Sequence, residues 1–254
     1  MTQKQPRPTG ARDANRARVR TRLLDSAEEL FADRGYFGTS VRDITDHAGT
    51  RVAAISDYFQ GKDNLFRHVL LRRIQPINDD RRALLAALPS TGSRDERLRA
   101  LIHAFAHPML ARADENQGWR HYFRFIAQLA NSGQSVQLLV ADEYNSIADA
   151  FIERLRHLFP EAGDTALHDA YLLMLASTLQ IFSNNLRLDS LTVGRIRTDD
   201  LDQRYASLVV FLEGGISRLA STRPPSPRDL GIIATSSPGL PYGSDREDEA
   251  EGEG

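Results

Sequence analysis

A chain of 254 residues, of which 41% are hydrophobic and 26% charged, is long enough to bury one large core or two modest ones. It contains no cysteine, which excludes disulfide bridges, thiolate metal sites and cysteine nucleophiles, and no apolar run approaches the roughly 20 residues that span a bilayer. The net charge of -2 conceals a basic N-terminal part, because residues 1–73 carry two lysines and twelve arginines against nine acidic residues.

The N-terminal segment is polar and basic. Residues 1–15 contain Pro6, Pro8 and Gly10 and few apolar residues, so we predict a flexible arm. Basic side chains in such an arm either stay in solvent or contact a polyanion, and the sequence leaves both interpretations open. The first 20 residues lack the apolar core of a signal peptide, so we expect a cytoplasmic protein.

Two helices are predicted next. Apolar residues recur at helical spacing over residues 16–34, and Gly35 then provides a left-handed C-terminal cap. A short helix follows, because Ser40 and Asp43 match a capping box and the apolar residues after them share one face.

A turn at Gly49 leads into a third, short helix over residues 51–58. Its spacing predicts that Val52, Ile55 and Phe59 face the core. The outward face then presents small and polar side chains, namely Arg51, Ala53, Ala54, Ser56 and Asp57.

The rest of the chain is predicted to be helical until a C-terminal tail. A fourth helix begins near Lys62, and Pro76 is expected to kink or end it, as Pro108 is expected to bend a later helix. Asp164 is a predicted N-cap. No stretch alternates as a strand does, so the predicted fold class is all-α. Further helices are predicted over residues 95–107, 119–130, 135–159, 164–186 and 199–220, with a loop over residues 187–197.

The two short helices, with a glycine turn between them, have the layout of a helix-turn-helix. A major groove about 12 Å wide accepts one α-helix, which must be held by its inner face while its outer face meets base edges. The N-termini of the second and fourth helices, at Thr39, Ser40 and Lys62, present free amides suited to phosphates. The sequence therefore predicts that this segment binds DNA.

The segment LLDSAEELFADRGYFGTSVRDITDHAGTRVAAISDYFQGKDNLFRHVL, Leu23 to Leu70, resembles the N-terminal domain of the TetR family of bacterial transcriptional regulators. The matching motifs are "A…LF…GY…TSVRDI…AG" and then "YF..K..LF". A further phrase, "VAAI…YF.GK" followed by "RR…P.N..R", is similar to a subgroup whose members sense fatty-acyl or other small compounds. Outside this fifth of the chain, the likeness lies in the number and length of the amphipathic helices.

The resemblance implies roles for individual residues. Thr39 corresponds to a phosphate contact, Tyr58 to a DNA-backbone contact and Lys62 to a phosphate-binding lysine. The sequence departs from the family where Ser56 replaces a common tyrosine and where Asp57 replaces an aromatic or basic residue. An acid at that position needs a partner, either cytosine N4 or a neighbour such as Arg51. The recognition-helix positions are those of Arg51, Ala53, Ala54 and Ser56.

The resemblance also implies an organisation and a function. We expect a flexible arm (1–15), a helix-turn-helix domain (16–62), a helical effector-binding and dimerisation domain (63–222) and a disordered acidic tail (223–254). The expected protein is a ligand-responsive repressor that binds a pseudo-palindromic double-stranded DNA operator as a homodimer. The last two long helices are expected to form the dimer interface, although their apolar faces also suit an ordinary core. The acidic tail is either solubilising or a competitor of DNA for the basic arm.

Candidate effector contacts in the larger domain are aromatic, histidine and methionine side chains, and each also suits a hydrophobic core. Two of the histidines have i, i+4 spacing, but no third ligand follows, so no metal is predicted. No P-loop, nucleophile elbow or dinucleotide motif occurs, so neither a cofactor nor an enzymatic activity is predicted. The alternative is an all-α enzyme or small-molecule carrier whose N-terminal helices are structural. The candidate effector contacts in the larger domain are His103, His107, Trp119, Phe123, Tyr144 and Met174.

Overall fold

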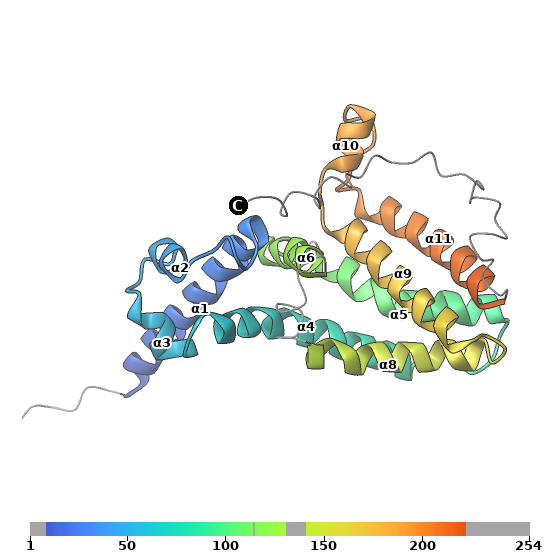
Figure 1. The fold of residues 1–254 in the computed structure, drawn as a ribbon, viewed down its shortest axis with the longest axis horizontal. Coiled ribbons are helices and arrows are strands. Elements are labelled where there is room, and N and C mark those ends of the chain that lie inside the picture. The colour runs from blue at the N-terminus through green and yellow to red at the C-terminus, as the bar shows by residue number, and fades with distance from the viewer. Residues whose placement is uncertain (1–8, 114, 131–140, 222–254) are drawn as a thin grey trace, which may run out of the picture.

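Ten helices and no strand make up the part of the chain that the structure, a computed structural model, describes: residues 9–113, 115–130 and 141–221 (Figure 1). The predicted all-α fold class is confirmed. The helices are α1 (Thr9–Arg34), α2 (Val41–His47), α3 (Ala53–Phe59), α4 (Lys62–Ala86), α5 (Arg94–Ala113), α6 (Gln117–Ala130), α8 (Ala141–Leu158), α9 (Asp164–Phe182), α10 (Arg187–Thr192) and α11 (Leu201–Ser221).

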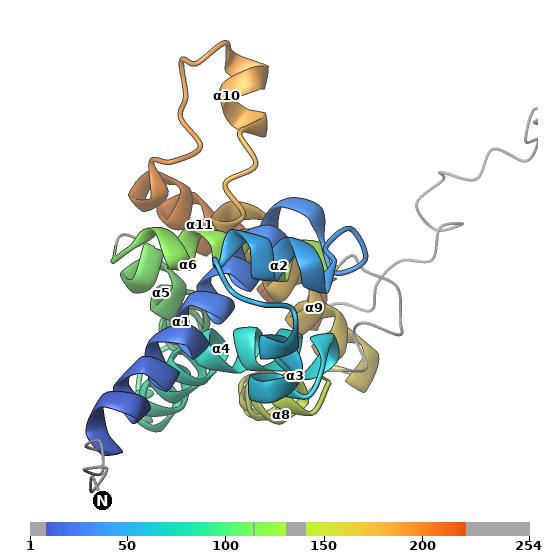
Figure 2. The same cartoon turned by 90° about the vertical axis from the view of Figure 1, so that its left-hand side faces the viewer.

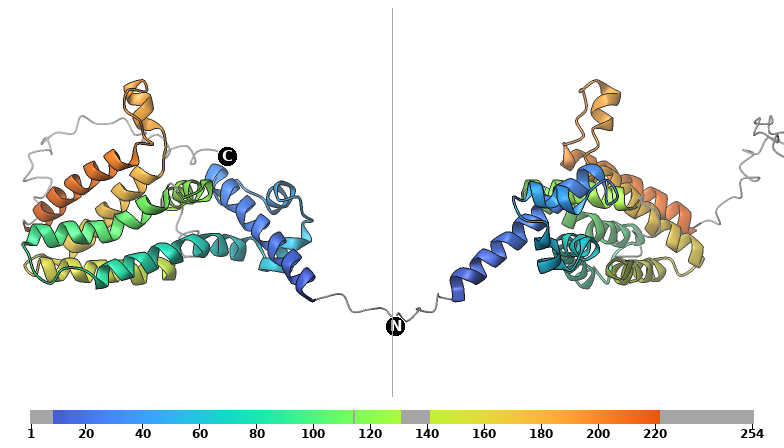
Figure 3. Two further views of the ribbon diagram at one scale, coloured as in Figure 1. Left: turned by 180° about the vertical axis from the view of Figure 1, so that it is seen from behind. Right: turned by 60° about the vertical axis from the view of Figure 1, so that its left-hand side comes forward.

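One long helix, α4, connects the two ends of the molecule. Helices α1 and α3 pack on its N-terminal part, and α2 packs on α1 and α3. Helices α5 and α8 pack on the C-terminal part of α4, and α9 and α11 pack on α5 and on each other (Figures 1 and 3). Helix α6 lies along α1 and also contacts α9, so it joins the small N-terminal unit to the larger bundle. Any change in the bundle that moves α4 or α6 is therefore transmitted to α1 and the two short helices.

The buried apolar side chains form two clusters. The proximal cluster unites α1, α2 and α3 with α6 and the first half of α4, and the distal cluster unites α5, α8, α9 and α11. Their boundary crosses α4 between Ile77 and Leu85 and crosses α5 between Ala106 and Met109. Members of the proximal cluster include Phe31, Ile44, Ile55, Phe59, Phe66, Tyr122, Phe123 and Phe182, and members of the distal cluster include Leu101, Phe105, Phe151, Phe159, Tyr171, Met174, Leu208 and Leu212.

Three predictions of helix limits need correction. Helix α1 begins at Thr9, so residues 9–15 are helical rather than part of a flexible arm. Pro76 does not end its helix, and the helix predicted over residues 95–107 runs past Pro108, because α4 and α5 continue beyond these prolines; a bend at each proline stays a prediction. Packing on both sides of these long helices outweighs the single backbone hydrogen bond that each proline removes.

The C-terminal helices also differ from the prediction. Helix α9 ends at Phe182 rather than 186, and α10 forms inside the predicted loop. Asp164 is the first residue of α9 rather than its N-cap, which is Gly163, and its carboxylate accepts a hydrogen bond from Arg156 instead. Residues 1–8, 135–140 and 223–254, which were predicted as arm, helix and tail, lie outside the described residues.

The α10 segment stands out from the bundle in every view (Figure 2). Its fold is local, because the carboxylate of Asp189 accepts hydrogen bonds from Thr198 and the Thr192 hydroxyl contacts Ile196. Its apolar side chains are exposed, with Val193 at 92% and Leu191 at 68%. None of the described helices combines the length and hydropathy needed to cross a membrane.

Candidate nucleic-acid interface

The turn between α2 and α3 is built as the sequence predicts. The Ser40 side chain accepts a hydrogen bond from the backbone N–H of Asp43, and the Asp43 carboxylate accepts one from the backbone N–H of Ser40, so the capping box is confirmed. Gly49 has a φ of +61°, which lets the chain turn sharply after α2. Gly35 has a φ of +69° at the end of α1, as predicted.

Helix α3 presents a polar face to solvent. Arg51, Ala53, Ser56 and Asp57 are exposed, as predicted from the sequence. Two neighbouring assignments were wrong, because Val52 is 52% exposed and Ala54 only 3%. The helix begins at Ala53 rather than at residue 51, so its buried side chains are Ala54, Ile55 and Phe59, and Val52 precedes the first turn. Ala54 therefore positions α3 against the core.

Asp57 forms an ion pair with Arg51, one of the two partners that the sequence analysis expected for this acid. Arg51 Nη2 lies 2.9 Å from Asp57 Oδ2, and both side chains are largely exposed. Arg51, Arg16 and Arg22 line a hollow between α1 and α3, together with Tyr58. The Arg16 guanidinium lies 5.3 Å from the centre of the Tyr58 ring. Three arginines around one hollow beside α3 create a positive surface suited to a phosphate backbone.

The predicted phosphate contacts differ in how available they are. The hydroxyl of Thr39 is buried and lies 2.9 Å from the carbonyl of Gly35 and 3.1 Å from that of Leu30, so it is already used inside the domain. Ser40 is exposed but caps α2. Contacts of these two residues with phosphate remain predictions, and the backbone amides at the start of α2 are the groups that stay open to solvent.

Lys62 begins α4 and is held in place by Tyr36. Its Nζ donates to the Tyr36 carbonyl at 2.6 Å and lies 4.0 Å from the centre of the Tyr36 ring. Partial burial lowers the pKa of Lys62. The Tyr36 hydroxyl donates to Asp63, and burial together with that carboxylate raises the pKa of Tyr36 to about 12. The lysine charge is therefore fixed beside the uncapped N-terminus of α4.

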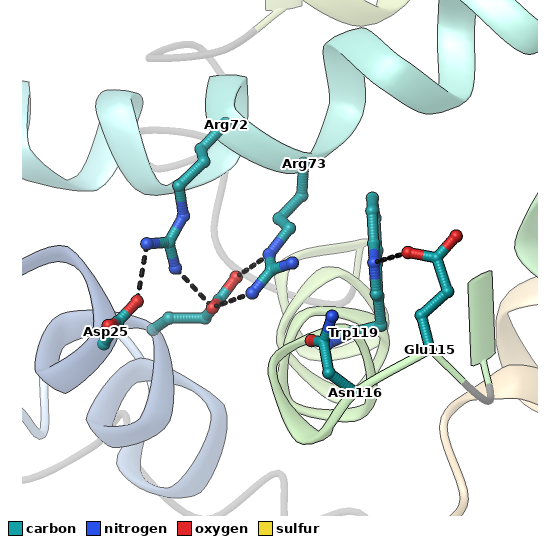
Figure 4. Close-up of polar contacts among 7 residues, drawn as sticks. Asp25, Arg72, Arg73, Glu115, Asn116 and Trp119 are labelled. Carbon is teal, nitrogen blue, oxygen red and sulfur yellow. Dashed lines mark hydrogen bonds and ion pairs between the residues drawn. The ribbon is translucent and has the colours of Figure 1, made fainter. Parts of the chain in front are cut away.

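A buried ion cluster, which the sequence analysis missed, joins α1 to α4 (Figure 4). Both oxygens of Glu28 are bound, Oε1 by Arg73 Nε at 2.9 Å and Oε2 by Arg72 Nη2 at 2.5 Å and Arg73 Nη2 at 2.9 Å. The Glu28 side chain is only 2% exposed. Arg72 also reaches Asp25 on α1 at 2.6 Å. The sequence feature that could have indicated this cluster is an acidic residue, Glu28, among the apolar residues of α1.

The same cluster extends to α6. The guanidinium of Arg73 lies 4.8 Å from the centre of the Trp119 ring, whose Nε1–H donates to Glu115 at 2.9 Å (Figure 4). Gly118 makes room for this arrangement, because a Cβ atom added there would lie 1.9 Å from Arg73 Nη2. Arg73 therefore contacts α1 and α6 at once, at the place where the small unit meets the bundle.

The predicted effector contacts do not converge on one site. His103 and His107 stack at 4.3 Å on the outside of α5, where His103 Nδ1 lies 2.7 Å from the Tyr205 hydroxyl. Burial, and then the charge of His107, lowers the pKa of His103. No group of three potential metal ligands occurs among the described residues. Trp119 and Phe123 are in the proximal cluster, Met174 is in the distal cluster, and Tyr144 packs against the edge of the proximal cluster.

Comparisons with known proteins agree at both ends of the chain. The family described as "Bacterial regulatory proteins, tetR family" matches residues 23–69, and "Tetracyclin repressor-like, C-terminal domain" matches residues 103–215. The chain is similar to the HTH-type transcriptional activator FasR of Mycolicibacterium smegmatis, with 28% identity over 206 residues, 80% of this chain and 85% of the relative. It is also similar to the HTH-type transcriptional repressor KstR2 of Rhodococcus jostii, with 38% identity over 82 residues, 28% of this chain and 40% of the relative.

Solved structures share the fold. A TetR-family regulatory protein from Rhodococcus RHA1 superimposes with a TM-score of 0.54 at 18% identity, over 78% of this chain and 96% of that one. The regulator FadR from Bacillus subtilis, solved in complex with stearoyl-CoA, superimposes with a TM-score of 0.50 at 15% identity, over 77% of this chain and 98% of that one.

Proposed function

This chain belongs to the TetR family of bacterial regulatory proteins and is a DNA-binding transcriptional regulator, and we propose that it acts as a ligand-responsive repressor on a pseudo-palindromic operator. The observation that carries the proposal is the exposed surface of α3 and the turn before it, where Arg51, Ser56 and Asp57 are exposed and Arg51 and Asp57 line the arginine-rich hollow. Arg51 and Ser56 read base edges, whereas Tyr58 and Lys62 contact the phosphate backbone.

A dimer places two such faces on one side of the duplex. Helices α9 and α11 pack together and leave four apolar side chains exposed, Leu172 and Leu173 at 57% each, Val210 at 71% and Phe211 at 67%. Adjacent exposed apolar side chains favour burial against a second copy. The two α3 helices would then lie about one DNA turn, roughly 34 Å, apart and read two half-sites.

A small molecule that binds the larger bundle would regulate this dimer. Such an effector must bind the form that does not fit the operator better than it binds the operator-bound form. The FadR structure holds stearoyl-CoA, and an acyl compound is the effector class that this likeness suggests. Helices α4 and α6 are the connections through which the bundle moves the N-terminal unit.

Repression needs no further partner, because a bound dimer excludes other proteins from the same DNA. Activation is the second candidate, because the relative that matches over 206 residues is named an activator. A promoter fused to a reporter gene, measured with and without the regulator gene, decides the sign. A rise in reporter output when the regulator is deleted supports repression, and a fall supports activation.

Selection of bound fragments from genomic DNA, followed by a salt series on the best fragment, tests the proposal. The logarithm of the binding constant should fall linearly with the logarithm of salt concentration, because phosphate contacts release counterions. Lys62→Ala should weaken binding to every duplex, whereas Ser56→Ala should change which duplex is preferred. A protein that selects no fragment and shows no salt-dependent binding would instead support the enzyme or carrier alternative.

A further inference from the structure

A buried cation lies at the boundary between the proximal and distal clusters. Arg81 is on α4, between Ile77 of the proximal cluster and Leu85 of the distal cluster, and only 5% of it is exposed. Its guanidinium lies 4.2 Å from the centre of the Phe105 ring on α5. A charge at this depth requires an explanation, because burial of an unpaired ion opposes folding.

Among the described residues, most of the hydrogen-bonding capacity of Arg81 has no close partner. Its Nε donates to the carbonyl of Phe105 at 2.9 Å. The terminal nitrogens have only long contacts, Nη1 to Asn78 Oδ1 at 3.4 Å and Nη2 to the sulfur of Met109 at 3.8 Å. A guanidinium carries five N–H donors in a planar fork, so one short bond leaves four of them poorly satisfied.

The described side chains that act on Arg81 itself are tyrosines, whereas carboxylates act only on the tyrosines, Glu28 on Tyr122 and Asp149 on Tyr171. Burial lowers the pKa of Arg81, and the neighbours that oppose this effect are Tyr171, Tyr122 and Tyr144, with no carboxylate among them in the described part of the chain. Tyr122 is fully buried, and its hydroxyl interacts with Tyr144, although it has no partner with good hydrogen-bond geometry among the described residues. Burial raises the pKa of Tyr122 well above its usual value, so this hydroxyl is a neutral donor.

One cation and a neutral tyrosine hydroxyl fit a ligand with a single negative charge. A carboxylate accepts two parallel hydrogen bonds from a guanidinium fork, which would use the two terminal nitrogens of Arg81. The hydroxyl of Tyr122 adds a further donor. A doubly charged phosphate would require a second cation, and the described side chains that act on these tyrosines include no cation besides Arg81.

The remaining walls are apolar and adaptable. Two of the three methionines of the chain are here, Met109 in contact with Arg81 and Met174 one helical turn after Tyr171. Both are fully buried. Unbranched thioether side chains change shape readily to accommodate a guest. Pro76 on α4 and Pro108 on α5 each remove one backbone hydrogen bond close to this place, so both helices bend here more easily.

We propose that Arg81 is the anion receptor of the effector site, and that the effector is an amphipathic monocarboxylate whose head pairs with the guanidinium while its apolar body separates α4, α5 and α9. This rests on the proposed function, because it names the chemical class to which the regulator responds. A ligand at the boundary of the two clusters moves one against the other, and the proximal cluster contains the helix-turn-helix.

The test measures ligand binding by the full-length protein without DNA. Thermal unfolding and calorimetry with sodium decanoate, decanol, methyl decanoate and decanoyl-CoA separate the acidic head from the chain and from the thioester. Decanoate should raise the unfolding temperature and bind at least about 10-fold more tightly than decanol or the ester. The same comparison with acids of about 6 to 16 carbons, and with phenylacetate, covers other apolar bodies.

Variants assign the effect to Arg81. Arg81→Met keeps the length and apolar surface of the side chain and should reduce carboxylate binding at least about 10-fold. Arg82→Met, the matched control on the same helix, changes an exposed residue that pairs with Asp79 and should bind decanoate normally. If Arg81→Met shows no cooperative unfolding, Tyr122→Phe replaces it and should weaken carboxylate binding several-fold through the loss of one oxygen.

Each outcome decides the question. Preference for the acid over its alcohol, lost in Arg81→Met and kept in Arg82→Met, supports the proposal. Equal binding of acid and alcohol, tighter binding of decanoyl-CoA than of decanoate, or no carboxylate-specific binding across the series overturns it. DNA binding is measured separately, so a protein that binds DNA but no carboxylate refutes only this inference, and one that binds carboxylates but no DNA refutes the proposed function.

Discussion

The guanidinium of Arg51, two residues before α3, and the carboxylate of Asp57, within α3, lie 2.9 Å apart and form an ion pair. The pair orients Arg51 on the surface that we propose meets DNA. It also masks one positive charge with a negative one, which lowers attraction for phosphates of any sequence. Asp57 therefore acts against indiscriminate binding, and its removal has a measurable consequence.

Asp57→Asn should raise the affinity for duplexes of unrelated sequence by roughly threefold or more, because a negative charge near the phosphates is removed. Folding stability should change by no more than about 0.5 kcal/mol, since both partners are largely exposed. Fluorescence anisotropy with operator and scrambled duplexes measures the change in specificity. Unchanged affinity for the scrambled duplex would show that Asp57 lies away from the DNA.

Glu28→Ala should destabilise the protein by about 3 to 5 kcal/mol, because Arg72 and Arg73 lose the buried carboxylate that compensates their charges. Urea unfolding at neutral pH measures the loss. Glu29→Ala is the matched control, since its carboxylate is 43% exposed and should cost well under 1 kcal/mol. Equal losses in the two variants would contradict a structural role for the cluster.

Gly118→Ala should expel the Arg73 guanidinium from its place between Glu28 and Trp119, because the new Cβ atom would stand 1.9 Å from Nη2. The expected cost is about 2 to 3 kcal/mol, because the two hydrogen bonds from Arg73 to Glu28 are lost while Arg72 still covers Glu28. Thermal unfolding checks it. Gly215→Ala, inside α11, where no atom lies within 4 Å of the added Cβ, should not destabilise the protein.

The capping box makes a pH-dependent contribution to stability. Hydrogen bonds from the hydroxyl and the backbone N–H of Ser40 hold the pKa of Asp43 below its ordinary value. A carboxyl group with a lowered pKa in the folded state stabilises the fold above the unfolded pKa, about 3.9, and loses that contribution as the pH falls through the folded value. The unfolding temperature of wild type should exceed that of Ser40→Ala at neutral pH. The difference should narrow in strong acid, and a constant difference would contradict this account.

Phe211→Asp should dissociate the dimer, because it places a charge among the exposed apolar side chains of α9 and α11. Sedimentation analysis measures the oligomeric state, and affinity for the full operator should fall towards that for a half-site. Phe37→Asp changes a side chain that is 75% exposed near the helix-turn-helix and should leave the oligomeric state intact. A dimer that survives Phe211→Asp would place the interface elsewhere.

Local signals in the sequence predicted local structure well. Gly35, the Ser40–Asp43 box and the glycine turn at Gly49 each determine backbone geometry through their own atoms, and all three are confirmed. On the inner face of α3, Ile55 and Phe59 were predicted correctly, but Val52 was predicted in place of Ala54, since a helix of 7 residues contains too few turns for its apolar period to fix the starting point. The continuity of α4 through Pro76 depends on packing, which no local rule contains.

The buried charges were beyond the reach of the same reasoning. Glu28 and Arg81 are charged residues within apolar helical patterns, and reasoning from apolar spacing alone predicts that they face solvent. Their partners, Arg73 and Phe105, lie 45 and 24 residues away in the chain. Only the fold brings these residues together, so the ion cluster around Glu28 and the proposed anion receptor, Arg81, could be identified only from the structure.

Because α4 is one continuous helix, a small bend within it displaces its N-terminal end by a distance that is large enough to disturb DNA binding. Fourteen residues separate Pro76 from Lys62, a length of about 21 Å at 1.5 Å per residue. A bend of about 5° at the proline therefore shifts the start of the helix by about 1.8 Å. In a two-fold assembly the two shifts add, and a mismatch of about 3 to 4 Å exceeds the tolerance of a hydrogen bond to a base edge.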